Sequence, residues 1–262
     1  MREFLAGHFT LLAALLALAL FVAMLLAVEA GLRLGRRYRA THGEKAEGLG
    51  TLEGGVLGIM GLLLAFSFSG AAGRFDDRRA LIVEEANDLG TAWLRLDLLP
   101  DSAQPAIRES FRSYVDARIE AYRALPDYNA SMTHLARAGE LQGIIWNQAV
   151  SATKGGWVPA ANLLLPSLNA MFDITTTRMY ATRMHPPVPL YLLLAVLMLI
   201  ASILAGYGMS GSSTRRWSHV IAFVLIMSIT AWIIVNLEFP RVGVIGVEDF
   251  DQAIVEVRAT MR

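Results

Sequence analysis

Four long stretches of this chain contain no aspartate, glutamate, lysine or arginine, and they constrain the fold more than any other feature. They cover residues 9–28, 54–73, 186–214 and 220–237. A helix needs about 20 apolar residues to cross a hydrocarbon core of about 30 Å. The sequence therefore predicts four transmembrane helices, over about residues 9–28, 54–73, 187–208 and 219–237.

A signal peptide is the alternative interpretation of the first stretch. Its apolar run is longer than a typical signal h-region, and no small-residue cleavage site stands out. Charged residues follow it directly, at Glu29, Arg33, Arg36 and Arg37. We therefore expect residues 9–28 to form a retained membrane helix.

Composition excludes several classes of function. Only 18% of the 262 residues are charged, against about 25% in an average soluble domain. The net charge is zero, so no bulk attraction to nucleic acid is expected. Cysteine is absent, which rules out disulfides, thiolate metal sites and cysteine nucleophiles.

The charge-free stretches divide the chain into four parts. We predict a first transmembrane pair at 1–73, a helical soluble domain at 74–185, a second transmembrane pair at 186–237 and a tail at 238–262. Apolar residues of the soluble domain recur at three- and four-residue intervals, at Leu81, Ile82, Ala86, Leu89, Trp93 and Leu96. This helix is expected to continue from the second span to Pro100. Because no segment reads as part of a β-sheet, the predicted fold is an all-α integral membrane protein.

Capping and breaking residues predict the remaining helices. Asp101 or Ser102 is the expected N-cap of a helix that ends at Pro126, with Pro105 tolerated in its first turn. Further helices are expected at residues 131–153 and 160–184, separated by Gly155, Gly156 and Pro159, and at residues 252–261 after a solvated turn.

The second span carries the residues that we interpret as a pore lining. Leu62 and Phe66 lie one helical turn apart on one stripe, and a ring of them around an axis would form a hydrophobic gate. Gly55, Gly58 and Gly61 give a groove for close packing of a neighbouring helix. The alternative is ordinary helix packing, because apolar gates and apolar interfaces use the same residue types.

Charged residues follow the second span directly. We predict that Arg74, Asp77 and Arg78 shape the electrostatic field at the pore entrance. The alternative is that this cluster, which also contains Asp76 and Arg79, anchors the helix at the membrane interface and forms local salt bridges.

Two adjacent carboxylates, Glu84 and Glu85, lie further along the same predicted helix. Neighbouring helical positions point in different directions, so a solvated or salt-bridged helix face is favoured over acid–base or metal chemistry. Arg178, on another predicted helix, is the candidate salt-bridge partner of Glu85.

No residue pattern indicates catalysis, a metal site or a cofactor. The five histidines do not pair at ligand spacing, and no nucleotide-binding or nucleophile motif is present. The acidic residues of the tail do not match an EF-hand loop; they are Glu238, Glu248, Asp249 and Asp251. We therefore expect no enzymatic activity, no metal and no cofactor.

Several segments resemble the bestrophin family. In the segment GLLLAFSFSGAAGRFDDRR, an apolar run is followed by arginine, an aromatic, an acidic residue and arginine, here Arg74, Phe75, Asp77 and Arg79. A second similarity is Arg178 followed by HPPVPLY, which places Pro187, Pro189 and Tyr191 at the entry to the third span. The chain is most similar to a bacterial bestrophin-like group of unknown function, through VEEANDLGTAWLRLDLLP, LNAMFDITTTR and LEFPRVGVI.

This resemblance implies a pentamer in the bacterial inner membrane, with the second span surrounding a central pore. The narrow neck would lie near Gly58, Leu62 and Phe66, with inorganic ions passing through it and lipid around the spans. The resemblance also implies a cytoplasmic soluble domain, whereas the basic connector from Arg33 to Lys45 favours an outside N-terminus. Phe75 stands where bestrophins have a tryptophan-rich exit, and the acidic cluster of the tail is thin, so calcium gating is not implied.

Two functions follow as expectations. The first is an oligomeric ion channel that conducts passively through a pore lined by the second transmembrane helix. The alternative is a non-conducting oligomeric membrane scaffold or sensor, in which the glycines serve packing and the soluble helices bind a partner.

Overall fold

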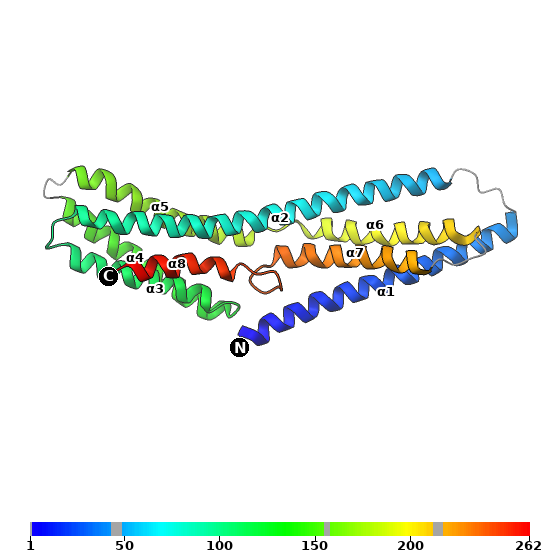
Figure 1. Ribbon diagram of the computed structural model, residues 1–262, viewed down its shortest axis with the longest axis horizontal. Coiled ribbons are helices and arrows are strands. Elements are labelled where there is room, and N and C mark those ends of the chain that lie inside the picture. The colour runs from blue at the N-terminus through cyan, green and yellow to red at the C-terminus, as the bar shows by residue number, and fades with distance from the viewer. Residues whose placement is uncertain (1, 43–48, 155–157, 212–216) are drawn as a thin grey trace. The chain divides into compact units, whose positions relative to one another are not determined.

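The computed structural model describes residues 2–42, 49–154, 158–211 and 217–262, and every regular element within them is helical (Figure 1). This confirms the predicted all-α fold. Gly155, Gly156, Lys45, Arg215 and Arg216 lie outside the described residues. The elements are α1 (Arg2–His42), α2 (Leu49–Arg95), η1 (Leu96–Leu98), α3 (Gln104–Arg123), α4 (Tyr128–Thr153), α5 (Val158–Arg183), α6 (Val188–Gly208), η2 (Met209–Gly211), α7 (Trp217–Glu238) and α8 (Glu248–Thr260).

The chain forms two compact units. The helical unit comprises Met1–His8, Arg74–Met184 and Pro240–Arg262, and the membrane unit comprises Phe9–Gly73 and His185–Phe239. Four stretches are long and apolar enough to cross a membrane: His8–Thr41, Gly50–Leu98, Pro159–Gly211 and Trp217–Glu238. Three of these stretches, of 34, 49 and 53 residues, are much longer than the about 20 residues that a span needs. We therefore assign the spanning part of α2 to its charge-free residues 54–73, and the remainder of α2 to the helical unit.

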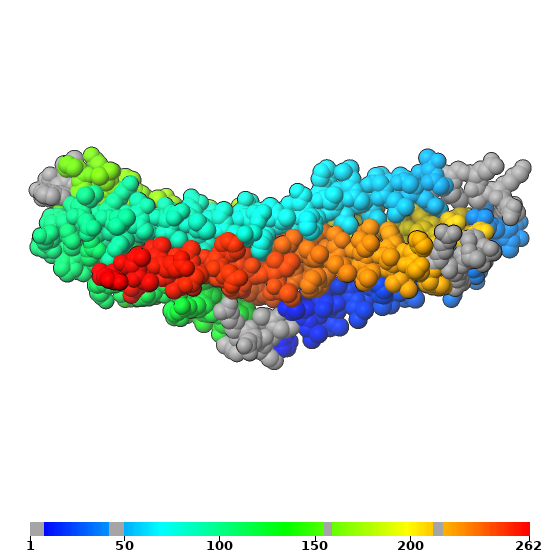
Figure 2. Space-filling model, in the orientation of Figure 1, coloured from blue at the N-terminus to red at the C-terminus, as the bar shows by residue number. Residues whose placement is uncertain are grey.

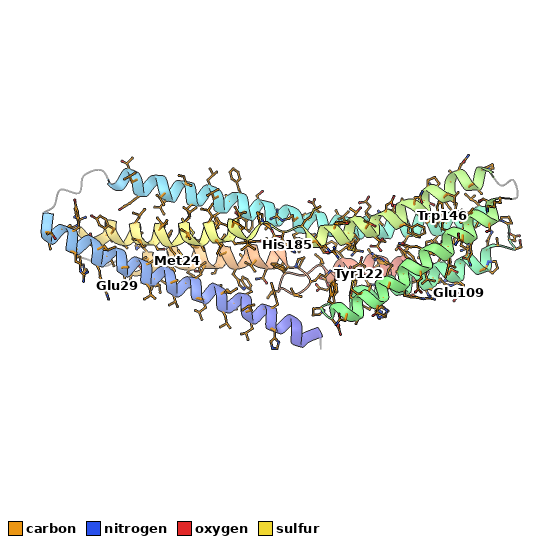
Figure 3. The ribbon with its side chains drawn as sticks, turned by 180° about the vertical axis from the view of Figure 1, so that it is seen from behind. Met24, Glu29, Glu109, Tyr122, Trp146 and His185 are labelled. Atoms are coloured by element: carbon orange, nitrogen blue, oxygen red, sulfur yellow. The ribbon has the colours of Figure 1, made fainter. Side chains whose placement is uncertain are left out.

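Close packing of α1 against α6 organises the membrane unit. A Cβ atom at Gly31 would overlap with the backbone carbonyl of Ile203, and one at Gly206 would overlap with that of Val28. Small residues let helix backbones approach closely in a membrane, where burial of apolar surface gives no advantage over lipid. Met24, which is labelled in Figure 3, is fully buried in the same unit.

A single apolar core holds the helical unit together. Aromatic side chains link α2, α3 and α5 through it, with ring centroids 5.7 Å apart for Trp93 and Phe111, and 6.3 Å apart for both Phe111–Tyr114 and Tyr114–Phe172. The C-terminal segment contributes the buried side chains Val247, Ile254 and Met261 to this core. The segment after α7 is therefore an integral part of the helical unit.

Several helix boundaries differ from the sequence prediction. Neither Asp101 nor Ser102 caps α3, because Pro100–Ala103 forms a turn in which the Ala103 N–H donates to the Pro100 carbonyl at 2.8 Å. The N-cap of α4 is Asp127, whose side chain accepts from the Ala130 N–H, so this helix begins earlier than predicted.

The tail helix α8 also begins earlier than predicted, at Glu248. Three residues that were expected in a solvated turn, Glu248, Asp249 and Asp251, form its first turn. Acidic side chains are favourable there because they face the positive end of the helix dipole. The last residue of α7, Glu238, is fully buried, so the solvated turn is wrong for that residue as well.

Candidate functional site

The spanning part of α2 presents an open face made largely of small residues. No described atom outside the local helix lies within 4 Å of a Cβ atom built on Gly54, Gly55, Gly58 or Gly61. The two large side chains predicted to gate, Leu62 and Phe66, are 55% and 65% exposed. Figure 2 shows this part of α2, in cyan, with much of its surface uncovered.

The open face of α2 differs from the exposed face of α1 in composition. The exposed side chains of α1 are dominated by leucine, at Leu11, Leu12, Leu15, Leu16 and Leu18. Long apolar side chains of this kind suit contact with lipid tails. Glycine, alanine and serine suit close contact with another helix instead. The open face of α2 therefore has the composition of a helix–helix contact that one protomer leaves unfilled.

The glycine contacts within the protomer occur where the sequence analysis did not place them. A Cβ atom built on Gly55 or Gly61, predicted to pack helices, would meet no described atom of another helix within 4 Å, whereas one on Gly31 or Gly206 would overlap with a neighbouring backbone. A signal for this contact was present in the sequence, because Gly31 and Gly35 in GLRLG have the G-x-x-x-G spacing of closely packed membrane helices.

Arg78, predicted at the pore entrance, is buried in the helical unit. Its Nε donates to the Ala181 carbonyl at 3.1 Å and its Nη2 donates to the Met184 carbonyl at 2.9 Å. These carbonyls lie at the C-terminal end of α5, where arginine satisfies groups that have no partner within the helix. Arg78 therefore holds the end of α5 and does not present its charge to solvent.

The other charged residues after the span divide into two groups. Arg79 pairs with Asp76 at 2.9 Å and places its guanidinium over the Phe250 ring, 4.3 Å from the ring centroid. It therefore connects α2 to α8. Asp77 is exposed and Arg74 is half-buried. Of the three residues predicted to shape the entrance, only Arg74 and Asp77 keep side chains accessible to water.

An ion-pair network centred on a buried carboxylate joins four helices of the helical unit and the segment that precedes the last of them. Glu85 of α2 is completely buried, and it accepts from Arg118 of α3 at 2.7 and 3.0 Å and from Arg178 of α5. Arg178 also lies 3.5 Å from Asp251 of α8. Asp251 in turn accepts from Arg241, in the segment before α8. The structure thus brings together the candidate pair Glu85 and Arg178, and adds three further charges to it.

Tyr122 of α3 lies at the centre of these charges. Three guanidinium carbons lie near its ring centroid, those of Arg178 at 4.1 Å, Arg118 at 4.9 Å and Arg241 at 5.1 Å. Arg118 also donates to the Tyr122 hydroxyl. Cations are attracted to the negative face of an aromatic ring, and more strongly when water is excluded. The ring therefore offsets part of the repulsion among three arginines held by two carboxylates.

Burial and charge act in opposite directions on Glu85. Burial alone raises the pKa of this carboxyl, but Arg118 and Arg178 outweigh that effect and lower the pKa to about 2. Burial also raises the pKa of Tyr122, and Arg118 opposes this rise only in part. At neutral pH the network therefore contains an ionised Glu85 and a protonated Tyr122.

Three members of this network, Arg118, Tyr122 and Arg241, were not predicted from the sequence. Arg118 and Tyr122 are four residues apart on the apolar side of α3, with Phe111 and Val115. An arginine on the buried side of an amphipathic helix indicates a buried partner, because an unpaired charge is costly there. That pattern was visible in the sequence, whereas Arg241 carried no comparable signal.

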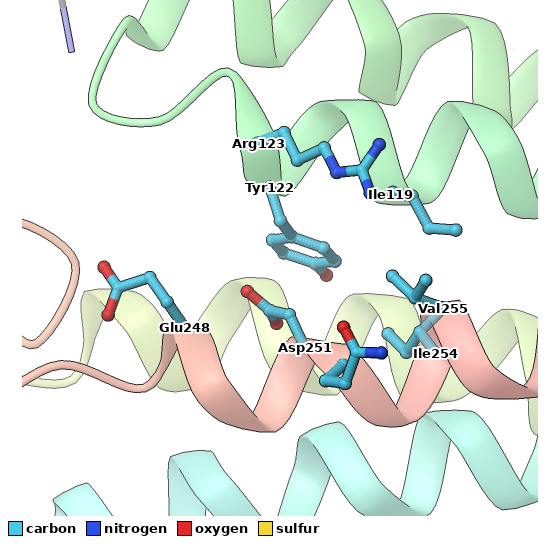
Figure 4. Close-up of a pocket in the computed structure, with 8 residues that line it drawn as sticks. Ile119, Tyr122, Arg123, Glu248, Asp251, Ile254 and Val255 are labelled. Atoms are coloured by element: carbon cyan, nitrogen blue, oxygen red, sulfur yellow. The ribbon is translucent and has the colours of Figure 1, made fainter.

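A small pocket lies between α3 and α8, close to this network (Figure 4). Two acidic side chains line it, Glu248 and Asp251, and Asp251 is paired with Arg178 and Arg241. No group of three or more histidine or acidic side chains within the described ranges could hold a metal ion. The residues lining the pocket are Ile119, Tyr122, Arg123, Glu248, Asp251, Gln252, Ile254 and Val255.

Comparison with known proteins relates this fold to a known family. Among curated proteins, no sequence matches this chain. A crystal structure of a mutant of a bacterial bestrophin homologue from Klebsiella pneumoniae is similar, with a TM-score of 0.66 and 15% identity. The similarity covers 94% of this chain and 98% of that one, which extends the shared fold over nearly the whole molecule. The family model described as the bestrophin-like domain matches residues 50–250, so this chain belongs to the bestrophin-like family.

Proposed function

We propose that this protein is an oligomeric ion channel that conducts passively through a pore lined by α2. The observation that carries the proposal is the open face of α2, where glycines leave space and where Leu62 and Phe66 are among the large exposed side chains, together with Leu57, Ile59 and Phe68. Membership of the bestrophin-like family supports an oligomer of the kind that the sequence resemblance implies, a pentamer in the bacterial inner membrane with the helical unit in the cytoplasm.

Leu62 and Phe66 would form the gate. They lie four residues apart, about 6 Å along the helix axis, so copies of α2 around an axis would give two successive apolar rings. Apolar constrictions close to ions by losing their water, without any moving plug. Gly58 and its neighbours would let the helices approach closely enough for the constriction to be narrow.

The charged residues after the span would act at one mouth of the pore. Arg74 and Asp77 keep accessible side chains there, and charges of either sign at a narrow opening change the local ion concentration. Glu85 would hold the continuation of α2 in the helical unit through Arg118 and Arg178. The helical unit would thus fix the helix that lines the pore.

Recording from the purified full chain in planar bilayers with asymmetric salt tests this proposal. We expect discrete currents, with a conductance or open probability that rises in Leu62→Ala and in Phe66→Ala. The matched control is Leu16→Ala, because Leu16 of α1 is 60% exposed, like the two gate residues, but lies on the leucine-rich face. Unchanged currents in both gate variants would refute the gate.

Labelling distinguishes a channel from a non-conducting scaffold or sensor. The chain contains no cysteine, so Leu62→Cys and Leu16→Cys each introduce one thiol into a clean background. A channel predicts that a water-soluble thiol reagent modifies position 62 and spares position 16. Silence of a folded, oligomeric sample, combined with a position 62 that resists the reagent, would favour the scaffold.

A further inference from the structure

The C-terminal end of α1 carries arginines that the proposed channel does not use. Arg33, Arg36 and Arg37 are all exposed, and Leu34 and Tyr38 are exposed beside them. The preceding residues 9–28 are free of charge and fill about 30 Å at 1.5 Å per residue. The exposed arginines therefore begin where the hydrocarbon core of a bilayer ends.

The packing of α1 directs these arginines away from the protein. Gly31 and Gly35 face α6 and η2, where a Cβ atom on Gly35 would lie 2.9 Å from the Tyr207 carbonyl oxygen. Arg39, one turn after Gly35, is on the same side and donates to the Ser210 hydroxyl at 3.0 Å. At 3.6 residues per turn, positions 33 and 37 lie roughly opposite Gly35, and position 36 lies between the two sides.

Counter-charges within the described residues do not neutralise this group. Glu29, labelled in Figure 3, pairs with Arg33 at 3.0 Å, and the Arg33 side chain remains 73% exposed. No acidic side chain among the described residues forms an ion pair with Arg36 or Arg37. Positive charge therefore remains on this side of α1.

The phosphate layer of a leaflet is within reach of these arginines. By the helical rise per residue, Arg33 lies about 7.5 Å past the end of the charge-free stretch, and Arg37 lies about 13.5 Å past it. The headgroup region extends about 5–8 Å beyond the hydrocarbon core, and arginine side chains are long enough to reach back toward it. The leucine-rich face of α1 is exposed and has the composition that suits contact with the acyl chains of lipids.

We propose that Arg33, Arg36 and Arg37 form a binding surface for the headgroups of anionic phospholipids. A guanidinium donates two parallel hydrogen bonds to phosphate oxygens, and Leu34 packs between the arginines against the lipid. The surface selects lipids with a net negative charge over zwitterionic lipids, whose phosphate is compensated by an attached cation. This inference is independent of ion conduction.

Native mass spectrometry of the purified full chain in neutral detergent tests this surface. The protein is titrated with phosphatidylglycerol and, separately, with phosphatidylcholine, and the ratio of the two affinities is measured. Each arginine near an anionic surface contributes about fivefold, so R36Q/R37Q is expected to lower the ratio by about 25-fold. The preference of the wild-type protein should also weaken as salt is added.

Two matched variants make the result specific. R123Q/R137Q removes two exposed arginines of α3 and α4 and should leave the lipid preference unchanged. R36K/R37K keeps the charges and should retain most of the preference, which separates loss of charge from loss of fold. A wild-type protein without preference for phosphatidylglycerol would overturn the proposal. It would also be overturned if R36Q/R37Q retained the preference, or if the control pair lost it equally.

Discussion

Removing the charge of Glu85 should destabilise the helical unit strongly. In Glu85→Gln the side chain keeps its volume, but Arg118 and Arg178 lose the carboxylate that lies between them. Their side chains are only 3% and 6% exposed, so water cannot replace it. Breaking a buried ion pair by removing one partner costs about 3–5 kcal/mol, because the remaining charge stays buried without compensation.

Thermal unfolding of the full chain in detergent measures this effect. Trp93 of the helical unit is 6% exposed and lies in the core, so it contributes a report on unfolding of that unit to the fluorescence of the chain's five tryptophans. For a chain of this size, about 3–5 kcal/mol corresponds to a fall in melting temperature of about 10 °C. The neighbouring Glu84 is exposed, which makes Glu84→Gln a control with the same chemical change.

The outcome separates a structural network from a collection of surface charges. Glu84→Gln should melt within about 2 °C of the wild-type protein, because surface substitutions rarely exceed 0.5 kcal/mol. If Glu85→Gln melts equally close to the wild-type protein, the buried network does not contribute the stability assigned to it. If the network does stabilise the unit, the double variant Glu85→Gln/Arg118→Gln should lose less stability than the sum of the two single variants. The second change then removes a charge that the first has already left unpaired.

Two further predictions follow from the same structure. The pKa of Glu85 falls from 4.5 to about 2 on folding. Its ionisation therefore contributes about 3 kcal/mol to the free energy of unfolding above pH 4.5, and this contribution is lost as the pH falls through 2. A pH series of melting curves should show this loss in the wild-type protein but not in Glu85→Gln. Gly206→Ala should destabilise the membrane unit by about 1–3 kcal/mol, because the added methyl group overlaps with Val28. Gly58→Ala places its methyl group in open space and should leave the stability of the protomer unchanged or higher. Melting temperatures in detergent compare the two variants.

The sequence anticipated local features of the fold well. Each of the four apolar stretches contains a long helix within its described residues, and the soluble region is helical, because hydrophobic periodicity and the absence of charge act over neighbouring residues. Helix starts were less accurate. Asp101 and Ser102 have the chemistry of an N-cap, but the turn at Pro100–Ala103 places the start of α3 beyond them.

The partners of buried groups were harder to anticipate. The candidate pair Glu85 and Arg178 was proposed from residue type, and the structure brings the two together, but Arg118 and Arg241 entered the network without being predicted. Arg78 was placed at a pore entrance because it follows the span in sequence. In the structure its guanidinium reaches carbonyls of Ala181 and Met184, more than 100 positions later in the chain.

The sequence by itself determined that this chain has four membrane-spanning helices and that Leu62 and Phe66 share one side of the second. Both results depend on helical periodicity and on the cost of unpaired polar groups in hydrocarbon, which are properties of short segments. Only the tertiary structure decided which glycines pack helices and which arginines neutralise Glu85. The partners of Glu85 come from positions 33 and 93 residues away in the chain, and sequence spacing does not say which distant segments meet.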